Sequence, residues 1–173
     1  PGRNMSIADG ALQLLPREGH GIHRPIDLFF RALAEDRRHR AIGVILSGTA
    51  SDGTLGLEAI KGEGGVTFAQ TEKSAKHPSM PHSAITSGAA DQVYIPKDIA
   101  KELGRISRHP YVATFSKITE NASPPELRER DSLMKIFAMV RAKSGVNFNN
   151  YKAPTLRRRI SRRMILHKID GLQ

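Results

Sequence analysis

The chain has 173 residues, 39% of them hydrophobic, and a formal net charge of +10. This composition supports a buried core and excludes a disordered chain, while the 5% aromatic content and the absence of Trp argue against a stacking platform for single-stranded nucleic acid. The absence of Cys excludes disulfides and fits a cytoplasmic location, and no apolar run approaches the roughly 18 residues that a membrane span needs.

The first two thirds of the chain alternate between helical and extended patterns. Ala41–Leu46 is a continuous apolar run, which is typical of a parallel strand that is covered on both faces. We predict helices at residues 25–37, 53–62, 80–87 and 96–106, and parallel strands at residues 41–47, 66–70 and 91–96. The sequence therefore predicts an α/β fold built on a parallel sheet.

A Gly-rich turn, SGTASDG at Ser47–Gly53, follows the first of these strands. Ligands and catalytic groups gather at the carboxyl ends of the strands in an open parallel sheet, so Asp52 is a candidate catalytic carboxylate. Asp52, Ser51 and Thr54 are also good caps for the helix that follows, because their oxygens can accept hydrogen bonds from the unpaired amides of its first turn. Spacing alone leaves both interpretations open.

Several segments of this region resemble chemotaxis protein-glutamate methylesterases of the CheB type. The segments are SGTASDG at Ser47–Gly53, GGVTFAQ at Gly64–Gln70, HPSMPHSAI at His77–Ile85 and DQVYIP at Asp91–Pro96, with HRPIDLFFRALAED at His23–Asp36 upstream. The resemblance extends over residues 1–111 in consistent order. It implies the C-terminal part of a Rossmann-like methylesterase domain, whose reaction needs no cofactor.

The resemblance assigns a role to Asp52. In this family the Asp of the turn completes a Ser-His-Asp triad that hydrolyses γ-glutamyl methyl esters on chemoreceptors and deamidates some glutamines there. Asp52 would fix the tautomer of the His and stabilise its imidazolium form. The family turn usually reads TGMGxDG, so Thr49 takes the Met place, near a main-chain amide that faces the oxyanion, and Ala50 takes a Gly place. Ala50 would be strained if this position needs a positive φ.

The Ser and the His of the triad precede the region of the family with which Pro1 begins, and no G-x-S-x-G turn occurs in the chain. We therefore expect a segment of a longer protein that is inactive by itself. The family keeps PSMP close to the mouth of the active site, which makes His77 and Met80 candidate neighbours of the substrate. His20 and His23 lie three residues apart, but no further clustered ligands complete a metal site, so we expect none.

The basic residues concentrate towards the C-terminus. Residues 131–173 hold ten Lys and Arg against two Asp and Glu, whereas residues 1–130 are nearly balanced. Between these regions, Pro124 and Pro125 stiffen a polar segment and interrupt helices. We predict a domain at residues 1–115, a linker at residues 116–130 and an all-helical piece at residues 131–173.

The helical piece contains an amphipathic segment, APTLRRRISRRMILHKI at Ala153–Ile169. Its apolar positions fall four residues apart on one face, at Leu156, Ile160 and Met164. The other side carries like charges that repel at four-residue spacing, at Arg158, Arg159, Arg162 and Arg163. This basic face is either a solvated surface or a site for an acidic partner; few aromatics and no recognised DNA-binding motif speak against nucleic acid.

The pattern YKxxTLxRRIxRRM within Phe137–Gln173 is similar to the N-terminal helical domain of chemotaxis receptor methyltransferases of the CheR type. The resemblance implies that the Arg face helps to engage the acidic methylation region of a methyl-accepting chemoreceptor. In that family a following α/β domain binds S-adenosylmethionine, so we expect this cofactor only downstream of Gln173. We expect a hybrid methylesterase-methyltransferase protein, or alternatively a non-catalytic receptor-binding scaffold that acts through the basic helix.

Overall fold

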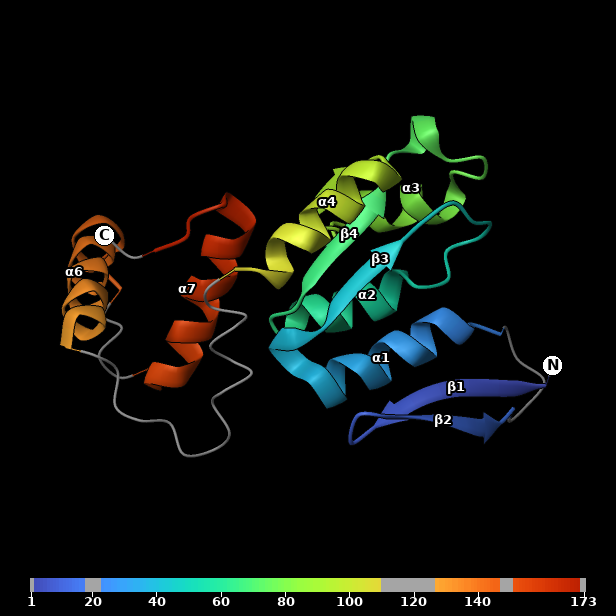
Figure 1. The fold of residues 1–173 in the computed structure, drawn as a ribbon, viewed down its shortest axis with the longest axis horizontal. Helices are drawn as coiled ribbons and strands as arrows, with labels where there is room; N and C mark the ends of the chain where they lie inside the picture. Colours follow the sequence, from blue (N-terminus) through green and yellow to red (C-terminus); the bar gives the residue numbers. More distant parts are fainter. Residues whose placement is uncertain (1, 18–22, 110–126, 147–150, 172–173) are drawn as a thin grey trace. The chain divides into compact units, whose positions relative to one another are not determined.

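The structure, a computed structural model, describes residues 2–17, 23–109, 127–146 and 151–171 (Figure 1). The chain forms two compact units, residues 1–105 and residues 106–173. Most of the predicted linker lies outside the described residues, and the three predicted domain ranges stay predictions.

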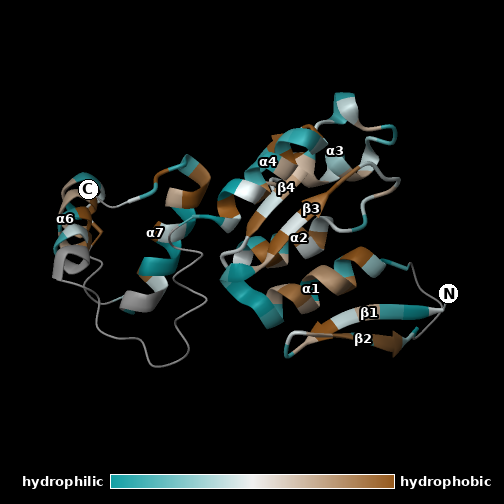
Figure 2. Ribbon diagram, in the orientation of Figure 1, coloured by the Kyte–Doolittle hydropathy of each residue, from teal (hydrophilic) through white to brown (hydrophobic). Residues whose placement is uncertain are grey.

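The first unit begins with a β-hairpin, which was not among the predicted elements. Its antiparallel strands are β1 (Arg3–Ala8) and β2 (Ala11–Pro16). Asp9 and Gly10 form the turn with φ values of 50° and 78°, the positive values that a two-residue hairpin turn needs. The Asp-Gly pair was the available sequence signal. β2 is mostly apolar (Figure 2) although it is exposed along its whole length.

The remaining elements of the first unit follow the predicted α/β order. They are α1 (Pro25–Arg37), η1 (Arg38–Arg40), β3 (Ile42–Ile45), α2 (Thr54–Gly62), β4 (Val66–Gln70), η2 (Glu72–Ser74), α3 (Ser79–Thr86), β5 (Gln92–Tyr94) and α4 (Pro96–Ser107). β3, β4 and β5 form a parallel sheet in that order. The predicted fold class is confirmed, and the predicted bounds of these strands and helices are shifted by only a few residues.

The core of the first unit lies between the sheet and its helices. Every residue of β4 is buried, as expected for the middle strand of a covered parallel sheet. α1 and α2 pack against each other, and α2 and α3 both contact β3 and β4. The close approach of α1 and α2 requires Gly56, because a Cβ there would overlap the Cβ of Phe30. This packing brings the first turns of α1 and α2 side by side.

The described part of the second unit is helical, as predicted. α6 spans Leu127–Ser144 and α7 spans Ala153–His167. α6 begins upstream of the expected boundary at residue 131, because a proline can precede a helix without breaking it and LRER after Pro125 and Glu126 consists of good helix formers. None of the helices in the described residues has the length and apolar character of a membrane span.

Candidate functional site

The turn between β3 and α2 leaves the carboxyl end of β3 and is anchored on the segment that leads into α3. The Gly48 amide donates a hydrogen bond to the carbonyl oxygen of His77 at 2.9 Å, and the Met80 amide donates one to the carbonyl oxygen of Gly48 at 3.1 Å. A side chain at position 48 would overlap Sδ of Met80 and would force the Met80 side chain to move. Main-chain contacts therefore fix the first half of the turn.

Gln70, the last residue of β4, was not predicted as a site residue. It is buried, and its Oε1 accepts a hydrogen bond from the Ser47 amide at 2.9 Å. Its Nε2 donates to Oγ of Ser74 at 3.0 Å. Gln70 thus holds the start of the turn from the neighbouring strand. The available signal was a polar side chain at the carboxyl end of a buried strand.

The carboxylate of Asp52 binds the first turn of α1. Its Oδ2 accepts a hydrogen bond from the Ile26 amide at 3.1 Å, and its Oδ1 accepts one from the Asp27 amide at 2.9 Å. Arg24, at the N-cap of α1, provides no side-chain hydrogen bond, so Asp52 satisfies amides that the helix leaves unpaired. Asp52 is half-buried, and within the described residues its carboxylate accepts hydrogen bonds from these two main-chain donors alone.

One of the two predicted roles for Asp52 was to cap the helix that follows it, α2. Asp52 does cap a helix, but that helix is α1. α2 has Gly53 at its N-cap, with φ 92°, so the N-cap residue itself provides no side-chain hydrogen bond. Thr54, also predicted as a cap, donates its hydroxyl to Oγ of Ser83 at 3.0 Å instead. The reason is the packing of α1 on α2, which places Asp52 over the N-terminus of a helix that lies 25 residues back in the chain.

A second carboxylate at this site, that of Asp27, is buried, and no sequence pattern singled it out. Its Oδ1 accepts a hydrogen bond from the Gly56 amide, in the first turn of α2, at 2.8 Å. Its Oδ2 is buried, has no hydrogen bond within the part of the chain that the structure describes, and lies 3.6 Å from Nη1 of Arg24. The two helices therefore cap each other: Asp52, from the turn before α2, caps α1, and Asp27, from α1, caps α2.

Thr49 and Ala50 are exposed in the same turn. Ala50 has a φ of 66°, so the condition for strain at this position is met. The Thr49 amide forms no hydrogen bond within the described residues, which suits a donor for an oxyanion. Its assignment as that donor stays a prediction.

His77 and Met80, the two candidate neighbours of the substrate, lie in different surroundings. His77 is exposed beside the turn. Met80 is 9% exposed and belongs to the core cluster that contains Ile45 and Leu57. The expectation for Met80 is therefore corrected, because its side chain fills the core, and His77 alone stays a candidate.

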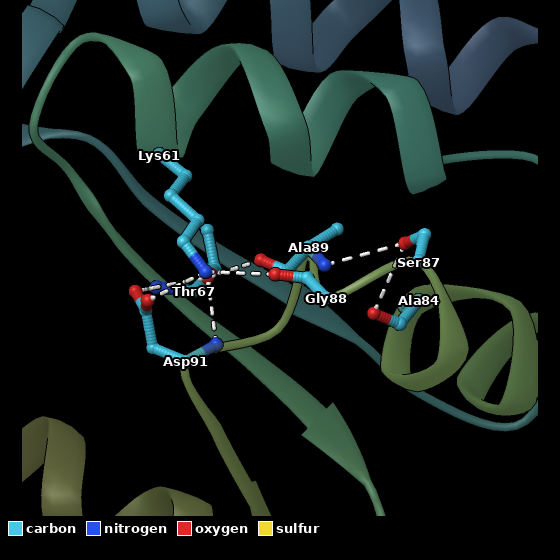
Figure 3. Close-up of polar contacts among 7 residues, drawn as sticks. All are labelled: Lys61, Thr67, Ala84, Ser87, Gly88, Ala89 and Asp91. Carbon is cyan, nitrogen blue, oxygen red and sulfur yellow. Dashed lines mark hydrogen bonds and ion pairs between the residues drawn. The ribbon is translucent and has the colours of Figure 1, made fainter.

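A separate polar network lies where β4 and β5 begin, at the opposite edge of the sheet (Figure 3). Oδ2 of Asp91 accepts a hydrogen bond from the Thr67 amide at 3.0 Å, and Nζ of Lys61 lies 3.3 Å from Oδ1 of Asp91. The Thr67 hydroxyl donates to the carbonyl oxygen of Ala89 at 2.7 Å, and Lys61 donates to that of Gly88 at 2.7 Å. Since these contacts join α2, β4 and the α3–β5 connection at the amino ends of the strands, we assign them to the fold.

The four arginines predicted as a binding face on α7 divide into two pairs. Arg159 and Arg163 are exposed. Arg158 and Arg162 are half-buried and interact with other groups of the chain. Of the four, Arg159 and Arg163 are therefore the ones that a partner could reach most readily. Of the predicted apolar positions on α7, Leu156 and Met164 are buried and Ile160 is half-buried; Ile165 is buried beside them.

Fold and turn together define an α/β domain in which a carboxylate, fixed by main-chain amides, lies at the carboxyl end of a parallel strand. Residues 1–103 match the model of the CheB methylesterase family, and the chain belongs to that family. Residues 131–173 match the model of the CheR methyltransferase all-alpha domain. Both resemblances drawn from the sequence are confirmed.

Known proteins are similar to the chain over different spans. The CheB methylesterase catalytic domain of Thermotoga maritima matches with a TM-score of 0.53 at 28% identity, over 60% of this chain and 57% of that chain. A protein-glutamate methylesterase/protein-glutamine glutaminase of Bordetella pertussis is 45% identical over 47% of this chain. An uncharacterized 104.1 kDa protein of Rhodobacter capsulatus is 31% identical over 99% of this chain, so a larger relative contains both pieces. The chain spans 23% of the Bordetella protein and 20% of the Rhodobacter protein.

Proposed function

We propose that the protein to which this chain belongs hydrolyses glutamate methyl esters on chemoreceptors, and that Asp52 orients the histidine of its catalytic triad. The family membership and the name of the Bordetella relative support ester hydrolysis, and that name supports glutamine deamidation as well. One observation carries the role of Asp52: the Ile26 and Asp27 amides hold its carboxylate beside the carboxyl end of β3.

Asp52 is suited to hold a histidine because both of its oxygens retain acceptor capacity. A carboxylate oxygen has two lone-pair sites, and one main-chain amide occupies one site on each oxygen of Asp52. A remaining site can accept an imidazole N–H, fix the tautomer of the ring and stabilise the imidazolium that forms when the histidine takes the serine proton. The N-terminus of α1 stabilises the negative charge on Asp52, because the helix dipole is positive there.

The reaction is an acyl transfer. The serine oxygen attacks the γ-carbonyl carbon of the methylated glutamate, methanol leaves with the proton from the histidine, and water then releases the glutamate by the reverse sequence. Glutamine follows the same steps with ammonia as the leaving group. We assign the serine and the histidine to parts of the protein outside these 173 residues, and the stabilisation of the oxyanion to the main-chain amide of Thr49.

The test is methanol release from a methylated chemoreceptor by the full-length protein with Asp52→Asn. We expect kcat to fall on the order of 10⁴-fold, because Asn keeps the size of the side chain but favours the wrong tautomer of the histidine and cannot stabilise the imidazolium. Asp91→Asn is the matched control, since the Asp91 side chain is 6% exposed and also accepts a main-chain hydrogen bond, at the opposite edge of the sheet. Equal kcat in the two variants would contradict the role of Asp52.

The helical unit supports a second function, the binding of the acidic cytoplasmic region of a methyl-accepting chemoreceptor. The observation is the exposed pair Arg159 and Arg163 in a segment where basic residues outnumber acidic ones by ten to two. We expect binding through this surface to weaken as the salt concentration rises. The same binding would also suit a scaffold that has no catalytic activity. Receptor binding that survives Asp52→Asn distinguishes this function from ester hydrolysis. Such a partner places the protein in the cytoplasm.

S-adenosylmethionine does not fit the described part of the CheR-like segment. Those residues form the helices α6 and α7 and contain no strand-to-helix turn of the kind that binds nucleotide-like cofactors. We therefore propose that the site for this cofactor lies outside the described residues, and we assign none of them to methyl transfer.

A further inference from the structure

We propose that Asp27 is a positioning residue for ester hydrolysis, which fixes the carboxylate of Asp52 through the cross-capped first turns of α1 and α2. The proposal rests on the proposed role of Asp52 in the triad. Its basis is the geometry of Asp27, which contacts both ends of the segment from Asp52 to Gly56.

The contacts of Asp27 close a small ring. Its main-chain amide donates to Oδ1 of Asp52 at 2.9 Å, and its own Oδ1 accepts a hydrogen bond from the Gly56 amide at 2.8 Å. The ring contains Gly53, whose left-handed backbone joins the turn to α2. A rotation of the Asp52 side chain, or a displacement of the first turn of α2, therefore breaks a hydrogen bond to Asp27.

Because its hydrogen bonds are buried or partly buried, this ring is less easily disrupted by water than an exposed helix cap. Asp27 is 4% exposed, and its Cα would lie only 3.2 Å from a Cβ at position 56, so the two backbones are in close contact. Little solvent reaches a hydrogen bond at this burial. Loss of the Asp27 acceptor leaves the Gly56 amide buried and unsatisfied, and the local structure has to shift to pair it.

The geometry assigns the effect to the acceptor atom of Asp27 and not to its charge. Oδ1 accepts the hydrogen bond from Gly56, whereas Oδ2 has no hydrogen bond among the described residues and lies 3.6 Å from Nη1 of Arg24. The Arg24 side chain is 40% exposed, so solvent screens this ion pair. Asn in place of Asp27 keeps the acceptor for Gly56 and is expected to keep the ring.

The experiment measures methanol release from a methylated chemoreceptor by the full-length protein. Asp27→Ala is expected to lower kcat about 10- to 100-fold with KM unchanged, because a displaced catalytic group slows the chemical step and leaves substrate binding intact. Asp27→Asn is expected to restore most of the lost kcat. Asp91→Ala, the matched control, removes a carboxylate of similar burial from the opposite edge of the sheet and is expected to lower stability but not kcat.

A double-mutant cycle separates positioning from general damage. In the Asp52→Asn background, Asp27→Ala is expected to cause no further loss of kcat, because Asp27 acts through Asp52. A wild-type kcat for Asp27→Ala, or the same loss in both backgrounds, overturns the proposal while the role of Asp52 stands. If Asp52→Asn alone leaves kcat unchanged, both the proposed function and this proposal are overturned.

A second variant covers the case in which Asp27→Ala does not fold. Asp27→Glu keeps the charge and the acceptor but moves both by one methylene group. We expect it to lower kcat and to leave KM unchanged, as for the alanine variant. A folded Asp27→Glu protein with wild-type kcat overturns the proposal.

Discussion

At the scale of single residues, Ala50 departs most clearly from ordinary backbone geometry in the turn after β3. Its φ of 66° lies in the left-handed region, where the Cβ of an L residue crowds the following carbonyl oxygen. Gly53, in the same turn, has a φ of 92° without such a Cβ. The turn therefore keeps one strained residue next to the candidate oxyanion donor.

Ala50→Gly is expected to stabilise the fold by about 0.5–1 kcal/mol, because relief of the left-handed strain outweighs the extra entropy of the unfolded chain. Ala100→Gly, at an exposed position of α4, is the matched control and should destabilise by about 1 kcal/mol. Urea unfolding midpoints measure both changes. A similar destabilisation in the two variants would be incompatible with a left-handed Ala50.

At the scale of elements, two polar networks join the layers of the first unit at opposite edges of the sheet. At the carboxyl edge, Asp52 and Asp27 link the first turns of α1 and α2. At the amino edge, Thr67 and Asp91 link the starts of β4 and β5, with Lys61 from α2 (Figure 3). Loss of the second network should therefore reduce stability without moving the candidate catalytic carboxylate.

Thr67→Val tests the second network. Thr67 is fully buried; its hydroxyl donates to the Ala89 carbonyl oxygen at 2.7 Å and accepts a hydrogen bond from the Asp91 amide at 3.0 Å. Valine has nearly the same shape but leaves the Asp91 amide and the Ala89 carbonyl with fewer partners, so we expect a loss of about 1–3 kcal/mol. Thr86→Val, at an exposed position in α3, should stay within about 0.5 kcal/mol. Thermal unfolding compares the two; equal shifts would contradict the buried network.

The elements could be predicted because their signals are local. Apolar runs and glycine turns mark β3 and β4, and the turn motif identifies Asp52. The helix that Asp52 caps could not be read in the same way, since the bonded amides lie 25 and 26 residues away and meet it only through packing. Asp27 looks like an ordinary acid in the first turn of an amphipathic helix, and only its burial against Gly56 reveals its contacts.

At the scale of the whole molecule, charge is divided between the two parts of the chain. Residues 131–173 hold ten of the 27 Lys and Arg but only two of the 17 Asp and Glu. The sequence predicted this division, but not that tertiary contacts would engage Arg158 and Arg162 and leave Arg159 and Arg163 exposed. If the protein binds an acidic partner as proposed, we expect the long-range attraction to come from the C-terminal part of the chain and direct contacts to include the exposed pair.

The double variant Arg159→Ala/Arg163→Ala should weaken binding to an acidic peptide from a receptor methylation region. Each exposed ion pair contributes about 0.2–1 kcal/mol, so we expect the affinity of the full-length protein to fall about 2- to 30-fold at low salt, and the difference to shrink as salt screens the charges. Lys73→Ala/Lys76→Ala removes two exposed charges from the first unit and is the matched control. Fluorescence anisotropy of a labelled peptide measures both; an equal loss in the control would mean that net charge, and not the surface of α7, attracts the receptor.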